Sequence, residues 1–148
     1  MPTKISAGLR AQVRVRAGFL CEYCHTQENW QYIPFFIDHV TPIAKLGLST
    51  LKNLALACPH CNRYKSDHEF AVDPSDQREV SLFNPREHHW EEHFIWSSDG
   101  ERIVPLTAIG RAAVELLQLN DARRMRIRAE DVKVNRHPPL NDPIQTAG

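Results

Sequence analysis

The alternation of apolar and polar residues near the N-terminus has the spacing of a short helix. In residues 6–18, SAGLRAQVRVRAG, Leu9 and Val13 fall on one face and the arginines fall on another. Ser6 is a favourable N-cap residue, and Gly18 is a favourable residue just past a helix end. We therefore expect the first element of the chain to be a helix.

Two short apolar runs in the front half have the character of strands. Residues 32–40, YIPFFIDHV, are rich in aromatic and β-branched residues, and Pro34 favours an edge or a strand start. Residues 54–57, LALA, form the second run, and a loop around Gly47 separates the two. CNRYKSDHEF, which starts at Cys61, begins a short helix. The pattern predicts a helix, a cysteine pair, a β-hairpin, a second cysteine pair and a helix.

The second half begins with a polar, turn-rich break at residues 73–79, DPSDQRE. Beyond it, HFIW and RIVPL flank Ser-Ser-Asp-Gly, an arrangement typical of a β-hairpin. Thr107 is placed to cap a helix over residues 108–119, and Asp121 is placed to cap a second helix, DARRMRIRAEDV. We expect a hairpin followed by two helices.

These elements predict an α+β fold in three parts. Residues 1–72 form the core with the cysteine pairs, and residues 73–134 form an extension of a hairpin and two helices. Residues 135–148 contain three prolines and little apolar content, so we expect a flexible tail.

The composition fits a soluble, cytoplasmic protein. The chain has 148 residues, of which 42% are hydrophobic, enough for a packed core. No apolar run approaches the length that spans a bilayer. The N-terminus, MPTKISAG, lacks the apolar centre of a secretory signal. We expect no membrane partner.

The charge is balanced overall but not along the chain. Eighteen basic and eighteen acidic residues cancel, which is not the strongly basic balance of a dedicated nucleic-acid coat. Residues 1–70 carry eight Lys or Arg and five Asp or Glu, whereas residues 71–148 carry ten and thirteen. The basic front half hints at an anionic partner.

The cysteines come in two C-x2-C pairs separated by 33 residues. Without a secretion signal, two such pairs favour a zinc site over disulfides, with redox dithiols or core cysteines as the alternative. Each pair can place two thiolates on one knuckle, and two knuckles complete a tetrahedron. A site with four thiolates is closed, so we expect a structural zinc. The predicted ligands are Cys21, Cys24, Cys58 and Cys61.

Asp38 and His39, at the end of the predicted strand, form a candidate reactive site together with Asn62, in the first turn of the following helix. The zinc would pin the strand to the helix and so bring Asp38 towards Asn62. One carboxylate and one amide oxygen suit Mg²⁺ or Mn²⁺ with several waters retained. Because side chains alternate along a strand, His39 faces away from Asp38 and can serve as a base.

The stretches CEYC, IDHVTP and LKNLALACPHCNRYKSD resemble the HNH endonuclease family, within the His-metal finger or ββα-metal nucleases. The resemblance covers residues 21–67, about a third of the chain. It implies a treble-clef-like core, a β-hairpin followed by a helix, braced by a four-Cys zinc. The segment from LFNPR onward is similar to the C-terminal extension of many small HNH proteins, which has no defined chemistry.

The resemblance implies a role for each motif residue. His39 would be the general base that activates water, and Asp38 and Asn62 would hold the catalytic divalent ion. Asn53 would be the middle Asn, whose side chain braces the loop and helps to orient His39. The family often has His at the third motif position, where this chain has Asn62, and an amide oxygen there still ligates.

These residues predict a metal-dependent endonuclease that acts on DNA, with RNA as the alternative substrate. Neutral His39 can take a proton from water near pH 7, and a cation can stabilise the leaving oxygen. Arg63 and Lys65, early in the same helix, are placed to contact flanking phosphates. Since the near-neutral charge predicts weak binding by the chain alone, a homodimer or a partner subunit is also expected.

Simpler interpretations exist for the same residues. Asn53 can be an ordinary turn residue, and Asn62 can be an N-cap. His39 taken by itself can be a core or surface histidine. The whole chain also fits a catalytically silent, zinc-braced module that binds nucleic acid, or a structural zinc protein. The basic residues between 123 and 128 fit the solvated face of a helix.

Overall fold

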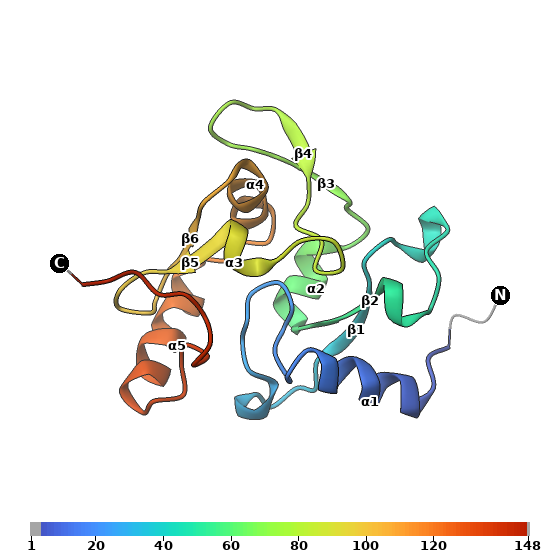
Figure 1. The fold of residues 1–148 in the computed structure, drawn as a ribbon, viewed down its shortest axis with the longest axis horizontal. Helices are drawn as coiled ribbons and strands as arrows, with labels where there is room; N and C mark the ends of the chain where they lie inside the picture. Colours follow the sequence, from blue (N-terminus) through green and yellow to red (C-terminus); the bar gives the residue numbers. More distant parts are fainter. Residues whose placement is uncertain (1–3, 148) are drawn as a thin grey trace. The chain divides into compact units, whose positions relative to one another are not determined.

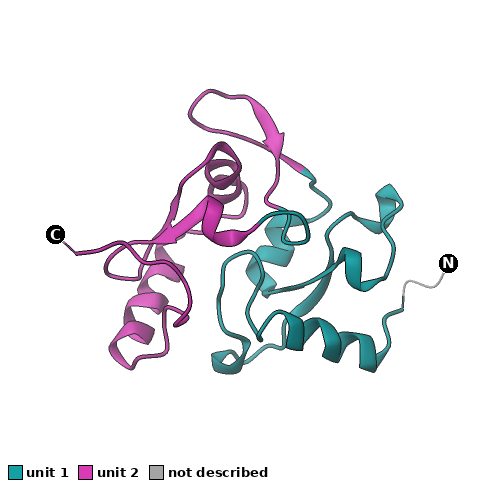
Figure 2. Ribbon diagram, viewed as in Figure 1, with its two compact units in different colours: residues 1–69, 84–88 teal, residues 70–83, 89–148 magenta. Residues whose placement is uncertain are grey.

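The computed structural model describes residues 4–147 and divides them into two compact units (Figures 1 and 2). Unit 1 comprises the chain up to Glu69 together with Asn84–His88, and unit 2 comprises Phe70–Phe83 and the chain from His89 on. Three two-stranded antiparallel sheets and several short helices make up the fold. The α+β class predicted from the sequence is confirmed.

Unit 1 contains three main elements besides short 3-10 turns. They are α1 (Ala7–Arg16), the hairpin of β1 (Phe36–His39) and β2 (Leu54–Ala57), and α2 (Pro59–Lys65). In Figure 1 the hairpin lies between α1 and α2, and both helices contact β2. The four residues of β2, LALA, are therefore buried on both sides.

The start and end of α1 follow from its flanking residues. The Ser6 hydroxyl accepts a hydrogen bond from the Leu9 N–H at 3.1 Å, which gives a partner to one N–H that a helix start leaves open. Val13 is fully buried. The chain leaves the helix through Gly18, whose φ of 63° lies in the left-handed region that suits glycine. The predicted helix is confirmed.

β1 is shorter than the strand predicted at residues 32–40, because side chains take over the backbone partners of Phe35. The Glu28 carboxylate accepts from the Phe35 N–H at 2.7 Å, and the Arg14 guanidinium donates to the Phe35 carbonyl at 2.9 Å. Pro34 has no N–H to offer a ladder. Pairing with β2 therefore starts at Phe36 and runs to His39.

Unit 2 is built from two hairpins and three helices. In chain order they are β3 (Phe70–Val72), β4 (Glu79–Ser81), α3 (Trp90–His93), β5 (Phe94–Trp96), β6 (Ile103–Pro105), α4 (Ala108–Leu116) and α5 (Ala122–Lys133). The predicted hairpin around Ser-Ser-Asp-Gly and the two helices capped by Thr107 and Asp121 are confirmed. The polar break at 73–79 contains the turn between β3 and β4, a hairpin that its short flanking strands did not reveal.

Aromatic side chains form the centre of unit 2. Trp90 and Phe94 have ring centroids 5.1 Å apart, and Trp96 lies 5.7 Å from Trp90. The buried Arg128 guanidinium lies over the Trp96 ring and donates to the Leu119 carbonyl at 2.7 Å. A charged side chain is tolerated inside this core because backbone carbonyls and an aromatic face surround it.

The chain beyond residue 135 returns to β5. The Trp96 N–H donates to the Pro143 carbonyl at 3.0 Å, and the Gln145 N–H donates to the Trp96 carbonyl at 2.8 Å. The indole N–H of Trp96 donates to Asp142 at 2.9 Å. These bonds extend β5 by one short parallel bridge. The division into parts at residues 72 and 134, and the flexibility of the last part, stay predictions.

Candidate active site and metal centre

The four cysteines gather into one buried cluster in unit 1. Their sulfur atoms all lie within 4.8 Å of one another, and the Sγ atoms of Cys24 and Cys58 are 3.6 Å apart. A tetrahedral zinc with Zn–S bonds of roughly 2.3 Å needs sulfurs about 3.8 Å apart, so the spacing fits that ion. The cysteines are free thiols. Cys21, Cys24, Cys58 and Cys61 are therefore consistent with a structural zinc site.

The chemistry of the cluster also calls for a cation. Burial raises the pKa of the Cys21 and Cys61 thiols well above the ordinary value, and the neighbouring Cys24 and Cys58 raise it further. Thiolates become stable in such a place only beside a positive ion. One backbone donor already points at the cluster, because the Cys61 N–H donates to the Cys58 sulfur at 3.4 Å at the start of α2.

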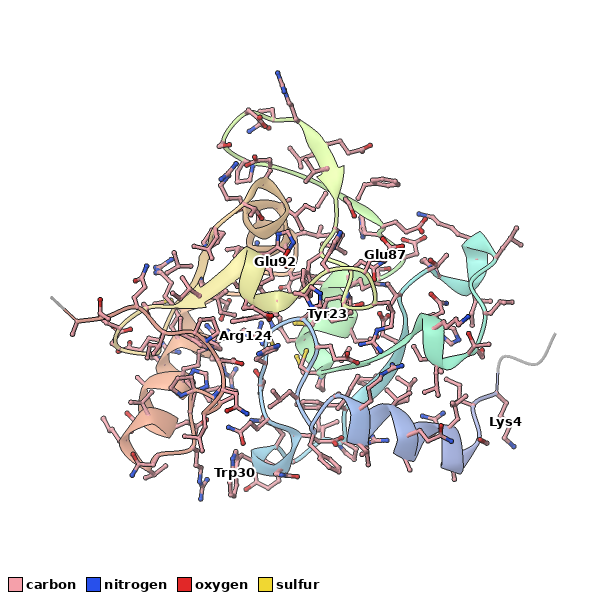
Figure 3. All side chains as sticks on the ribbon, in the orientation of Figure 1. Lys4, Tyr23, Trp30, Glu87, Glu92 and Arg124 are labelled. Carbon is pink, nitrogen blue, oxygen red and sulfur yellow. The ribbon has the colours of Figure 1, made fainter. Side chains whose placement is uncertain are left out.

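Asp38 lies in the interior, between the first cysteine pair and α2. The Tyr23 hydroxyl donates to its Oδ2 at 2.7 Å, and the Lys65 ammonium lies 3.3 Å from its oxygens. The side chains of Asp38 and Lys65 are only 7% and 2% exposed. Burial raises the pKa of the Asp38 carboxyl, and Lys65 and Tyr23 oppose that rise. The carboxylate is therefore held by a cation and a hydroxyl (Figure 3 labels Tyr23 and draws the cysteine sulfurs in yellow).

Lys65 also connects α2 to the end of β1. Its ammonium donates to the His39 carbonyl at 3.1 Å in addition to its contact with Asp38. The Lys65 ammonium is thus engaged inside the protein, and the phosphate contact expected for it from the sequence stays a prediction. Arg63, on the same helix, is exposed and keeps access to solvent.

His39 is half-buried at the end of β1. Its Nε2 lies 2.8 Å from the Ser49 hydroxyl oxygen. Burial lowers the pKa of the His39 imidazole, and the nearby Asp38 carboxylate works against that change. The ring is therefore neutral near pH 7, the state in which a histidine can accept a proton.

Asn53 closes the loop that follows His39. Its Oδ1 accepts from the Thr41 N–H at 2.8 Å, and its Nδ2 donates to the Thr41 and Leu48 carbonyls at 3.0 and 2.9 Å. Gly47 lies against the same segment, because a Cβ there would stand 1.7 Å from the Thr41 carbonyl oxygen. The loop that carries Ser49 is thus fixed by one amide side chain and one close backbone contact.

Asn62 occupies the first turn of α2, one turn before Lys65. Residues three apart on a helix share a face, so Asn62 lies on the face from which Lys65 reaches Asp38. Within residues 4–147 its side chain makes no hydrogen bond, which leaves its amide oxygen open to a ligand. A carboxylate accepts about four hydrogen bonds, so Asp38 also keeps acceptor capacity. Carboxylate and amide oxygens are the donors that Mg²⁺ and Mn²⁺ prefer, and a cation held by Asp38 and Asn62 stays a prediction.

Sequence reasoning missed two residues of this site and the position of a third. Tyr23 stands between two cysteines, where an aromatic residue carries no pattern that points to a carboxylate. Ser49 lies in a loop, and only the fold brings it to His39. The buried position of Lys65 had a weak signal, its i,i+3 spacing from Asn62 on one helix face.

Comparison with known proteins identifies the front part of the chain. Residues 21–68 match the profile of a family described as HNH endonuclease, which spans about a third of the chain. No curated protein and no solved structure matches the chain. No helix within residues 4–147 is long and apolar enough to cross a membrane.

Proposed function

We propose that residues 21–68, which form an HNH endonuclease domain, hydrolyse phosphodiester bonds of DNA with a divalent cation. The observation that carries the proposal is the arrangement at the end of β1. A neutral, half-exposed His39 stands next to a buried Asp38 that α2 and the first cysteine pair hold in place.

His39 serves as the general base in this proposal. When its Nε2–H donates to the Ser49 oxygen, the lone pair of Nδ1 is left for a water molecule. The ring takes the water proton while the oxygen attacks the phosphorus in line with the leaving 3′ oxygen. General base catalysis of this kind contributes roughly 10²- to 10⁴-fold. Asn53 keeps the loop with Ser49 closed and so fixes the orientation of the ring.

Asp38 and Asn62 would hold the divalent cation, Mg²⁺ or Mn²⁺. When bound, the ion supplies electrostatic stabilisation of the phosphate charge and of the leaving oxygen. Tyr23 and Lys65 position the Asp38 carboxylate from the protein side, so it does not have to reorganise during the reaction. Arg63, exposed on α2, contacts a flanking phosphate.

The test is a cleavage assay with zinc-loaded protein on supercoiled, linear and single-stranded DNA and on RNA, with Mg²⁺ or Mn²⁺. We expect the wild type to nick or cut DNA and His39→Ala to be slower by roughly 10²-fold or more, at an unchanged unfolding temperature. His89→Ala, a change to an exposed histidine outside the domain, is the matched control and should keep full activity.

The catalytically silent binding module gives a different result in the same assay. If the protein is such a module, His39→Ala and His89→Ala bind DNA with wild-type affinity, and the wild type cuts no nucleic acid with either cation. That outcome, with folded and zinc-loaded protein, rejects the enzyme.

A further inference from the structure

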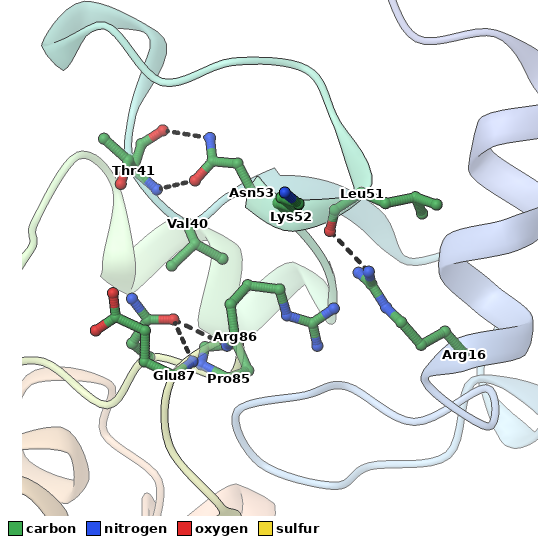
Figure 4. A pocket seen from close by; sticks show the side chains of 10 residues that line it. Arg16, Val40, Thr41, Leu51, Lys52, Asn53, Pro85, Arg86 and Glu87 are labelled. Carbon is green, nitrogen blue, oxygen red and sulfur yellow. Dashed lines mark hydrogen bonds between the residues drawn. The ribbon is translucent and has the colours of Figure 1, made fainter.

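Residues 84–86, the end of the LFNPR stretch, form part of a pocket in unit 1, and of its lining the proposed chemistry uses only Asn53. Residues 84–88 belong to unit 1 although both flanking segments belong to unit 2. Residues 84–87 line one side of a pocket of about 540 Å³, and the start of the loop after His39 lines the other (Figure 4). Its polar lining comes mainly from Arg16, Lys52, Asn53, Asn84, Arg86 and Glu87.

Arg86 is held in this pocket with part of its hydrogen-bonding capacity unused. Its Nη2 forms an ion pair with Glu22, the residue after the first zinc-ligand cysteine. Its buried Nε–H has no acceptor within the described part of the chain. That nitrogen is too buried to meet a ligand, but 16% of the Arg86 side chain stays exposed. A guanidinium that lines a pocket can donate to a phosphate through its Nη groups.

A second guanidinium and an ammonium line the same pocket. Arg16 donates to the Leu51 carbonyl at 2.7 Å and to the Leu54 carbonyl, which fixes its position beside the wall. Burial lowers the pKa of Arg16, the charge of Arg86 lowers it further, and the Glu22 carboxylate opposes the change. Lys52 is exposed and makes no ion pair or side-chain hydrogen bond with another described residue. Like charges gathered in this way favour an anion that binds between them.

The negative groups near the pocket do not balance this charge. Glu22 is engaged by Arg86, and Glu87 is the only acidic side chain among the described residues that line the pocket. Three cations against these two carboxylates leave an excess of one positive charge. The whole chain, in contrast, has a net charge of zero.

The pocket begins where the site around His39 ends. Val40 and Thr41, the two residues after His39, line the pocket, and the Asn53 clamp fixes Thr41 in place (Figure 4). Phosphates follow one another at about every 3.4 Å of helix axis along each strand of a duplex. A strand that presents one phosphate to His39 therefore has further phosphates within reach of the pocket.

We propose that this pocket binds a backbone phosphate of the nucleic acid, close to the phosphate that His39 attacks. The assignment rests on the proposed function for the position of the strand, but the pocket binds whether or not the strand is cut. Lys52 and Arg86 contact the phosphate oxygens, and Arg16 and Glu22 position the wall and the Arg86 guanidinium. The LFNPR stretch thereby gains a chemical role, the delivery of Arg86 to the substrate strand.

The test measures binding without cleavage. Affinity for a fluorescein-labelled DNA duplex is determined at several salt concentrations, with zinc-loaded protein and no added Mg²⁺ or Mn²⁺. Each phosphate contact contributes about 0.9 to the slope of log affinity against log salt. We expect Lys52→Ala to weaken binding and to reduce the slope by about 0.9. Lys4→Ala removes the same charge from an exposed position of unit 1 outside the pocket and should change neither.

Arg86 is tested with two variants, because loss of its ion pair with Glu22 can unfold the protein. Arg86→Lys keeps the charge but not the fork of N–H groups, and we expect weaker binding at a wild-type unfolding temperature. Arg86→Gln is compared only where its unfolding temperature shows it to be folded. Equal affinity and equal slope for Lys52→Ala and the wild type overturn the proposal.

Inorganic phosphate separates a nucleic-acid backbone from a small phosphate ligand. Phosphate at matched ionic strength could raise the unfolding temperature of the wild type and not that of Lys52→Ala. If DNA binding is unaffected by the same substitution, the pocket binds a small phosphate ligand and the backbone assignment is overturned. Cleavage is scored separately. If the protein cuts DNA but Lys52→Ala binds DNA as the wild type does, only this inference is overturned. If Lys52→Ala binds DNA more weakly but the wild type cuts no nucleic acid, only the proposed function is overturned.

Discussion

Asp38 and Lys65 form a buried ion pair, and the stability of the fold depends on both partners. Tyr23 and Lys65 both contact the carboxylate, and Lys65 also donates to the His39 carbonyl. Removing one partner of such a pair leaves an uncompensated buried charge, which costs far more than the pair itself contributes. Lys65 is therefore a positioning residue for both motif residues of β1.

The substitution Lys65→Met tests this role. It keeps the length of the side chain and removes the ammonium, so the free energy of unfolding should fall by about 3 kcal/mol, measured with urea. The double variant with Asp38→Asn should recover part of the loss, because the buried carboxylate is then neutral. Arg63→Met, on the exposed face of the same helix, is the control and should change stability little. A Lys65→Met protein as stable as the wild type contradicts the assignment.

The elements of the fold were predictable to the extent that their signals are local. α1, α4 and α5 each carry a capping residue, Ser6, Thr107 and Asp121, whose side chain accepts from a backbone N–H as expected. β1 was shorter than predicted because Glu28 and Arg14, distant in sequence, bind the backbone at Phe35. The β3–β4 hairpin was missed because β4, with the sequence EVS, has a single apolar residue, whereas the equally short β5 and β6 are mainly apolar.

One ion pair ties the β3–β4 turn to α4. The Arg111 guanidinium donates to both oxygens of the buried Asp73 carboxylate, at 3.0 and 2.9 Å. These bonds, together with the Ser75 N–H, hold the pKa of Asp73 well below its usual range. A carboxyl with a depressed folded-state pKa stabilises the fold above its unfolded pKa, about 4, and loses that contribution as the pH falls towards the folded value.

Asp73→Asn should therefore lower stability at neutral pH by more than it does in acid. We expect the difference in unfolding temperature between wild type and Asp73→Asn to be largest above about pH 5 and to shrink as the pH falls below about 4. Asp76→Asn, at an exposed neighbour in the same turn, is the control and should give a small difference at every pH. A difference for Asp73→Asn that stays constant across this range would mean that the ion pair does not carry it.

At the scale of the whole molecule, the two units are stabilised by different interactions. All four cysteines belong to unit 1, where the cluster connects the first knuckle to the start of α2. Unit 2 relies on aromatic packing around Trp96 and on the buried Arg128. Metal binding to such a cluster is coupled to folding, because the ligands are not assembled in an unfolded chain.

Zinc removal should therefore affect the units differently. Metal analysis of the purified chain should give about one zinc per molecule. After chelation we expect amide hydrogen exchange to become fast in β1, β2 and α2 and to stay slow in β5, β6 and α4. Cys58→Ser should reproduce the pattern without a chelator, and re-addition of zinc should reverse it only in the wild type. Uniform loss of protection across both units would show that the zinc site supports the whole fold.

Most of what the candidate site contains was determined by the sequence alone. The two cysteine pairs and the residues between them predicted the HNH domain and its four-cysteine cluster before any fold was known. The roles of Asp38, His39, Asn53 and Asn62 stay predictions. Capping residues and apolar periodicity likewise predicted α1, α2, α4, α5 and two of the three hairpins, because these signals act over a few residues, whereas the short α3 was not predicted.

Only the tertiary structure decided what surrounds these groups. Tyr23, Ser49 and Lys65 reach the motif residues through contacts that span 10 to 27 positions of the chain. Arg86 meets Glu22 across 64 positions. Lys65, expected from the sequence to contact a phosphate, lies in the interior beside Asp38. Local patterns cannot report such pairs, because desolvation and long-range packing depend on every element that closes around them.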